Sequence, residues 1–277
     1  MNVFIKKSLI IVTVLCAACA NKIEMPKGAW GEDAERAASY SVYKRAQIVQ
    51  LEPSIGTRSP RLNFAVELLD SSDEKVKTLL SKTIYDGSDC ARYTDERLRD
   101  IKKKYLDTKP EAAAINSEAM NWEFLETGRG SVYSNIIVIE RLRSMYEGGA
   151  HGITEREYFV LDKTAGKRLR LAELIKPANM NDIKKHAEAR LRSKYAIMNN
   201  MRVRPDITLS SLGFFEDSAA LPQDNFFVSP GGLSFIWNPY SIAPYSFGII
   251  EADLPYVDIE PYLSDAGRAV FNSIHKK

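Results

Sequence analysis

The chain has few of the residues that most often carry chemistry. Its 277 residues include only 3 cysteines and 3 histidines. Cys16 lies in the N-terminal leader that is expected to be removed, and Cys19 is the expected lipid-attachment residue, so Cys90 has no cysteine to pair with inside the chain. We expect Cys90 to be a small buried apolar residue and not a reactive thiol.

Catalytic and metal-binding motifs are also missing. His151, His186 and His275 do not form an H-x-x-x-H or H-x-H spacing, and G-x-S-x-G is absent. Two S-x-x-K matches, Ser72–Lys75 and Ser273–Lys276, lack their partner motifs. We therefore expect no metal, no cofactor and no enzymatic activity. A hydrolase with an unmarked carboxylate site among the 36 acids stays open.

Neither sign of charge is in excess. The chain has 38 lysines and arginines against 36 acids, and Lys6 and Lys7 belong to the N-terminal leader. Such a balance does not favour a nucleic-acid partner. The basic run Lys102–Lys104 is expected late in a helix, where cations suit the helix dipole.

The apolar run at the N-terminus is short. It covers residues 8–20, fewer than the about 20 that a bilayer-spanning helix needs, and predicts a signal peptide over residues 1–18. Leu15–Cys19 is similar to a bacterial lipobox and predicts acylation of Cys19; an ordinary signal peptide is the alternative. Two or more acyl chains hold a protein firmly at a membrane. Ala20 is typical of outer-membrane sorting in a host with two membranes, and residues 19–38 are expected to be a tether.

Hydrophobic periodicity predicts an α+β fold, with antiparallel sheets and packed helices. Turns are expected at Gly128–Gly130 and over residues 162–167. Helices are expected over residues 76–87, 94–105 (capped by Thr94), 181–198 and 265–275. Strands are expected over residues 40–51, 62–68, 121–126, 132–142, 153–161, 168–171, 226–228, 233–237 and 247–254.

Residues 146–152, YEGGAHG, place three glycines around His151. Glycine allows positive φ and close approach of two backbones. We therefore expect Gly148, Gly149 and Gly152 to shape the backbone. We expect His151 to be a structural or surface-contact residue, not a catalytic base.

Residues 235–247 are rich in aromatic side chains, and Pro239 and Pro244 stiffen this segment. Two interpretations stay open: packing in the core, or an exposed surface of rigid rings that loses little entropy on binding. Core packing is favoured for Phe235, Trp237 and Phe247, and neither interpretation is favoured for the tyrosines. The candidate ligand-binding residues are His151, Trp237, Tyr240 and Tyr245.

Three segments together resemble the extracytoplasmic domain of the RsiV lysozyme-receptor family. They are residues 134–152, 158–174 and 233–248, and the last contains NPYSIAPYSFG. Residues 39–131 more loosely resemble the domain that accompanies it in RsiV and in the PdaC deacetylases. The resemblance implies two α+β domains, residues 39–131 and 132–277.

The same resemblance implies a function at the cell envelope. Together with the lipobox-like site, it predicts a lipid-anchored, non-enzymatic binding protein, with binding or inhibition of a lysozyme-type muramidase as the first candidate activity. A peptidoglycan-binding module is the alternative. Neither sigma-factor control nor deacetylase activity is carried over, because a lipobox-like site replaces the transmembrane helix of RsiV and the catalytic domain of PdaC has no counterpart.

Overall fold

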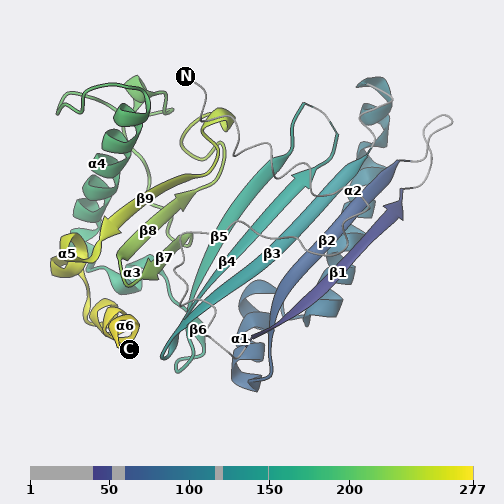
Figure 1. Ribbon diagram of the computed structural model, residues 1–277, viewed down its shortest axis with the longest axis horizontal. Coiled ribbons are helices and arrows are strands. Elements are labelled where there is room, and N and C mark those ends of the chain that lie inside the picture. The colour runs from purple at the N-terminus through teal and green to yellow at the C-terminus, as the bar shows by residue number, and fades with distance from the viewer. Residues whose placement is uncertain (1–39, 52–59, 116–120, 149, 277) are drawn as a thin grey trace. The chain divides into compact units, whose positions relative to one another are not determined.

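The computed structural model describes residues 40–51, 60–115, 121–148 and 150–276 (Figure 1). The expected signal peptide, the tether and Cys19 lie outside these ranges. The described residues form a six-stranded mixed sheet and a three-stranded antiparallel sheet with packed helices, which confirms the α+β prediction. No helix in these ranges is long and apolar enough to cross a bilayer.

The larger sheet has the strand order β1-β2-β3-β4-β5-β6. Every neighbouring pair is antiparallel except β2 and β3, which are parallel. A parallel pair needs a crossover connection, and two helices supply it: α1 (Glu74–Ile84) and α2 (Cys90–Ile115). The strands are β1 (Tyr40–Gln50), β2 (Arg61–Ser71), β3 (Trp122–Tyr133), β4 (Ile136–Tyr146), β5 (Ile153–Asp162) and β6 (Lys167–Arg168).

The main core lies between this sheet and the two helices, which cover one of its faces (Figure 1). The alternation predicted for β2 is confirmed, because every second side chain is at most 1 % exposed: Leu62, Phe64, Val66 and Leu68. Helix α1 buries the stripe Val76, Leu79, Leu80 and Ile84 against it. Burial of apolar surface contributes about 25 cal/mol per Å² and is the main stabilising term here.

The prediction that Thr94 caps a helix is wrong. Helix α2 begins at Cys90, and Asp89 caps it by accepting a hydrogen bond from the Arg92 backbone NH at 2.8 Å. Thr94 lies inside the helix, where its hydroxyl donates to the Cys90 carbonyl at 2.6 Å. The cap is the acidic residue five positions earlier in the chain.

The turn expected at Gly128–Gly130 is also wrong. Strand β3 continues to Tyr133, and the chain reverses at Ser134, whose φ is +53°. A Cβ atom at Gly130 would lie 3.1 Å from Cδ1 of Leu69, and one at Gly128 would lie 3.4 Å from Cγ of the same residue. These glycines therefore make room for Leu69 inside a strand. The strand expected over residues 132–142 is divided by the same turn.

The smaller sheet has the order β7 (Phe226–Ser229), β8 (Gly232–Trp237) and β9 (Ile250–Pro255). Helix α4 (Met180–Met198) packs against β9 with its predicted stripe buried: Ile183, Ala187, Leu191 and Tyr195. The strand expected from residue 247 begins instead at Ile250. The other helices are α3 (Leu171–Leu174), α5 (Tyr256–Ile259), α6 (Asp265–His275), η3 (Pro177–Asn179), η4 (Ser210–Leu212), η5 (Tyr245–Phe247) and η6 (Glu260–Tyr262).

Side-chain amides join the second half of the chain to the free edge of β5. Asn225 accepts a hydrogen bond from the Tyr158 backbone NH at 2.9 Å and donates to the Arg156 carbonyl at 2.8 Å. Asn238 accepts from the Arg156 backbone NH at 2.8 Å. Buried backbone groups need such partners. These bonds fix the loop after β8 beside the start of β5.

The boundary expected between residues 131 and 132 falls inside β3. Strands from both sides of it belong to one sheet, and residues 37–277 form one compact unit. The division into two domains stays a prediction.

Candidate binding site

Two loops that are distant in the sequence meet beside β5. The YEGGAHG loop connects β4 to β5, and residues 238–248 follow β8. The Tyr245 hydroxyl donates a hydrogen bond to the Gly152 carbonyl at 2.7 Å. The His151 ring stacks on the Tyr245 ring, with centroids 3.8 Å apart and planes 17° apart. The structure thus brings together two of the candidates from the sequence.

Tyr240 extends this arrangement outward. Its ring centroid lies 5.7 Å from that of Tyr245, with a 33° angle between the planes, and the residue is 53 % exposed. Offset ring pairs at such distances are favourable. We call His151, Tyr245 and Tyr240 the aromatic stack. It exposes ring surface to solvent, and its loop is attached to β5 and to the YEGGAHG loop by hydrogen bonds.

The backbone at Tyr240 is strained. The Ser241 NH donates to the Asn238 carbonyl at 3.0 Å, which closes a four-residue turn with Pro239 at its second position. Tyr240, at the third position, has φ +69°. Glycine or asparagine is preferred there, because a Cβ atom at positive φ costs about 1–2 kcal/mol. Strained residues of this kind cluster at ligand-binding sites.

Tyr195 and Phe214, which are both buried, support the half-buried Phe247 of the loop. Phe247 lies 5.3 Å from Tyr195 and 5.3 Å from Phe214, and these two rings are 5.0 Å apart. The Phe215 backbone NH donates to the Ile242 carbonyl at 3.0 Å. The loop is therefore attached at its end to the core beside α4, and the aromatic stack has little freedom to lose on binding.

The glycines of the YEGGAHG loop lie where side chains would not fit or would be strained. Gly148 has φ +82°. A Cβ atom at Gly152 would lie 2.8 Å from the Met145 carbonyl oxygen. Gly149 lies outside the described residues. The close approach of Gly152 to β4 places its carbonyl in reach of Tyr245.

Trp237 lies apart from the aromatic stack. It is 4 % exposed, and its indole NH donates to the Ala220 carbonyl at 2.8 Å. It also lines a cavity of about 590 Å³, together with Asn238 and Ser241, which lie on either side of Tyr240 in the chain. Trp237 is a packed residue that faces this cavity and not the open surface.

The hydrogen bond of the His151 ring is to its own loop. Nδ1 of His151 lies 3.1 Å from the carbonyl oxygen of the adjacent Gly152, and the residue is exposed. Among the described residues, no group of three or more histidine, cysteine or acidic side chains converges as a metal site would require. What the aromatic stack offers a ligand is ring surface.

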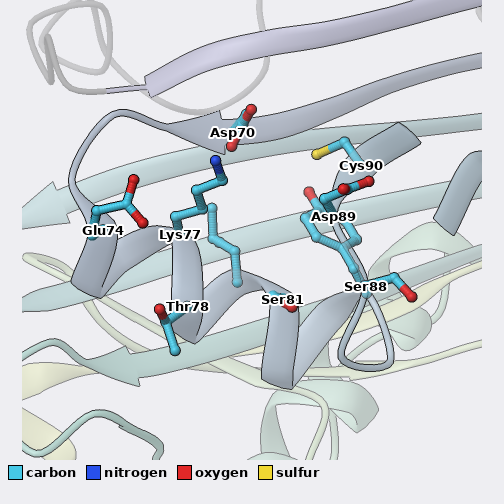
Figure 2. A pocket seen from close by; sticks show the side chains of 10 residues that line it. Asp70, Glu74, Lys77, Thr78, Ser81, Ser88, Asp89 and Cys90 are labelled. Atoms are coloured by element: carbon cyan, nitrogen blue, oxygen red, sulfur yellow. The ribbon is translucent and has the colours of Figure 1, made fainter. Parts of the chain in front are cut away.

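A second, smaller cavity of about 240 Å³ lies between α1 and the start of α2. Figure 2 shows Lys77 pointing toward Asp70 at this site. The Cys90 thiol donates to the Leu69 carbonyl at 3.5 Å, and burial first and nearby carboxylates second raise its pKa to about 11. A thiol with this pKa is a weak nucleophile at neutral pH. The expectation that Cys90 is buried is confirmed.

The structure also brings together a carboxylate pair that the sequence did not mark. Glu251 and Asp253 are on one face of β9, and burial first and Asp253 second raise the pKa of Glu251. The Ser234 hydroxyl donates to Asp253 at 2.5 Å, and Nη1 of Arg156 lies 3.8 Å from Glu251. The i, i+2 spacing in a strand was the available signal, but many other pairs share it.

One family model matches part of the chain. Residues 171–257 match the family described as "Protein of unknown function (DUF3298)". The match contains the NPYSIAPYSFG segment and with it Tyr240 and Tyr245. No curated protein matches the chain.

Two solved structures of DUF3298 proteins have a similar fold. A DUF3298 family member from Bacteroides fragilis superposes with a TM-score of 0.66 at 20 % identity, over 86 % of this chain and 99 % of that one. A DUF3298 family protein from Pseudomonas aeruginosa gives 0.53 at 17 % identity, over 82 % and 95 %. These likenesses extend well beyond residues 171–257, and at such identity they establish the fold alone.

Proposed function

We propose that this protein is a non-enzymatic binding protein of the bacterial cell envelope, anchored through a lipid on Cys19. Its ligand is held on the aromatic stack of His151, Tyr245 and Tyr240. The observation that carries the proposal is the exposed Tyr240 ring at a positive φ, on a loop attached to β5 and to a buried aromatic cluster. Rigid exposed aromatic residues of this kind are typical anchors of binding interfaces.

The first candidate ligand is a lysozyme-type muramidase, which the resemblance to RsiV supports. Binding at the muramidase cleft would shield the cell wall. The second candidate is peptidoglycan itself. It is supported by the cavity of about 590 Å³ beside Tyr240, whose lining combines amide, hydroxyl, guanidinium and carboxylate groups.

The test is a titration of residues 20–277 into a lysozyme-type muramidase while lysis of cell walls is followed. Stoichiometric inhibition is expected, with a loss of about 30-fold or more in affinity for Tyr240→Ala, the range of an interface hot spot. Val257→Ala is the matched control, because Val257 is 74 % exposed on α5, away from the loop. If the folded chain neither binds nor inhibits, the muramidase proposal fails and soluble peptidoglycan fragments become the ligand to titrate.

A further inference from the structure

The cavity beside Tyr240 has the size of a small-molecule site. Its volume of about 590 Å³ lies within the roughly 300–1,000 Å³ of pockets that hold drug-sized ligands. Ile236, Trp237 and Ile242 contribute apolar surface, and the polar side chains come from β5, β6 and the loops around residues 220–225 and 238–241. In such a site, the apolar surface contacts the body of the ligand and a few polar groups determine which ligand binds.

Hydrogen-bond donors are in excess in this lining. Arg168 uses Nη2 to donate to the carbonyls of Tyr158 at 3.0 Å and of Asp224, and Nε and Nη1 have no partner among the described residues. The side-chain oxygen of Asn238 accepts a hydrogen bond from β5, and its NH₂ group is available to a ligand. The Ser241 hydroxyl likewise has no partner within the described part of the chain. A ligand that matches this lining must bring acceptors.

Of the three charged residues in the lining, Glu157 and Asp224 are each paired with an arginine outside it, and Arg168 is the third. Glu157 is paired with Arg141, whose Nε and Nη2 lie 2.9 and 2.5 Å from one carboxylate oxygen. Asp224 is paired with Arg170 at 3.1 and 3.2 Å. Arg168 has no carboxylate of its own, and burial lowers its pKa because these two neighbouring acids offset the loss of solvent only in part.

We infer that this cavity binds a small ligand that carries one carboxylate group. The carboxylate accepts charge-assisted hydrogen bonds from Arg168, with Asn238 and Ser241 as further donors. The uncharged body of the ligand lies over Trp237 and Ile242 toward Tyr240. Two sources have this chemistry: an acidic amino sugar, or the free C-terminus of a short peptide. The inference does not depend on muramidase binding.

Calorimetric titration of residues 20–277 with two matched pairs of probes tests the inference. N-acetylmuramic acid and N-acetylglucosamine share a sugar ring and differ in the carboxylate, and N-acetyl-D-alanyl-D-alanine is compared with its amide. At least one acid is expected to bind tenfold or more tightly than its uncharged partner, and the pair that does so identifies the source. Equal affinities within both pairs, or no binding of any probe, would overturn the inference.

A cavity-filling variant locates the binding. Ala220 lines the cavity with an exposed side chain, so Ala220→Trp is expected to abolish binding of the acid with the fold intact. Glu216→Trp places the same ring on an exposed position of the same loop outside the cavity and is expected to bind as the native chain does. Undiminished binding by folded Ala220→Trp would refute the site. A chain that inhibits a muramidase but binds no probe would overturn this inference and leave the proposed function standing.

Discussion

Replacing Tyr240 tests the strained turn and the binding surface together. At an ordinary exposed position, alanine is more stable than glycine by about 0.4–1 kcal/mol, because glycine has more freedom to lose on folding. At φ +69° a Cβ atom costs about 1–2 kcal/mol, and glycine avoids that cost. The two terms together favour Tyr240→Gly over Tyr240→Ala by about 1 kcal/mol. Both variants lose the ring, so their difference isolates the backbone.

Urea unfolding at equilibrium measures this difference. The free energy of unfolding should be about 1 kcal/mol higher for Tyr240→Gly than for Tyr240→Ala, a shift of about 2–4 °C in Tm for a chain of this size. Lys185, exposed on α4, is the control position, where the order should reverse and alanine should be the more stable by about 1 kcal/mol. Both Tyr240 variants should lose ligand affinity alike. If alanine is the more stable residue at 240 as well, the argument from strain is refuted.

Three further substitutions probe other features. Gly152→Ala should lower the free energy of unfolding by about 1–3 kcal/mol in urea titrations, because its Cβ would lie 2.8 Å from the Met145 carbonyl; an unchanged midpoint would contradict this. The raised pKa of Glu251 means that folding favours its protonated form. Its contribution to stability is therefore full below the ordinary carboxyl pKa and is lost as the pH rises through the raised one. The Tm advantage of Glu251→Gln should accordingly be larger at pH 8 than at pH 4, and a constant difference would count against it. Glu126→Gln should cost about 3 kcal/mol by denaturant unfolding, since it leaves Arg143, 3.1 Å away, without its buried partner; a loss below 1 kcal/mol would argue otherwise.

Local periodicity was sufficient to predict most of the elements of the fold. The alternation from Leu62 to Leu68 and the helical stripe from Ile183 to Tyr195 are signals of a single element, and the structure bears them out. The error at Gly128–Gly130 has a different origin. A glycine in a turn and a glycine that admits Leu69 of the neighbouring strand are identical in the sequence, and the difference depends on a contact about 60 residues away.

The sequence indicated which residues belong to the candidate site, but it did not predict how they are arranged in space. The YEGGAHG loop and the NPYSIAPYSFG segment are each conspicuous in composition. The stacking of His151 on Tyr245 depends on the docking of the loop after β8 on β5, and the hydrogen bond from Tyr245 to Gly152 spans 93 residues. Asn225, which does much of this docking, is an ordinary loop residue in the sequence. Trp237 is buried and Tyr240, three residues later, is exposed, because the chain turns between them.

The side-chain amides that bond to β5 also determine where a further strand can pair with the sheet. A strand edge with free NH and carbonyl groups can pair with another chain and so invites aggregation. Asn225, Asn238 and the Arg168 guanidinium occupy the groups of Arg156 and Tyr158, so an incoming strand would find that stretch already bonded. At the opposite edge, β1 pairs only with β2 in the described part of the chain. An additional strand can therefore join this sheet alongside β1 and is blocked along the bonded stretch of β5.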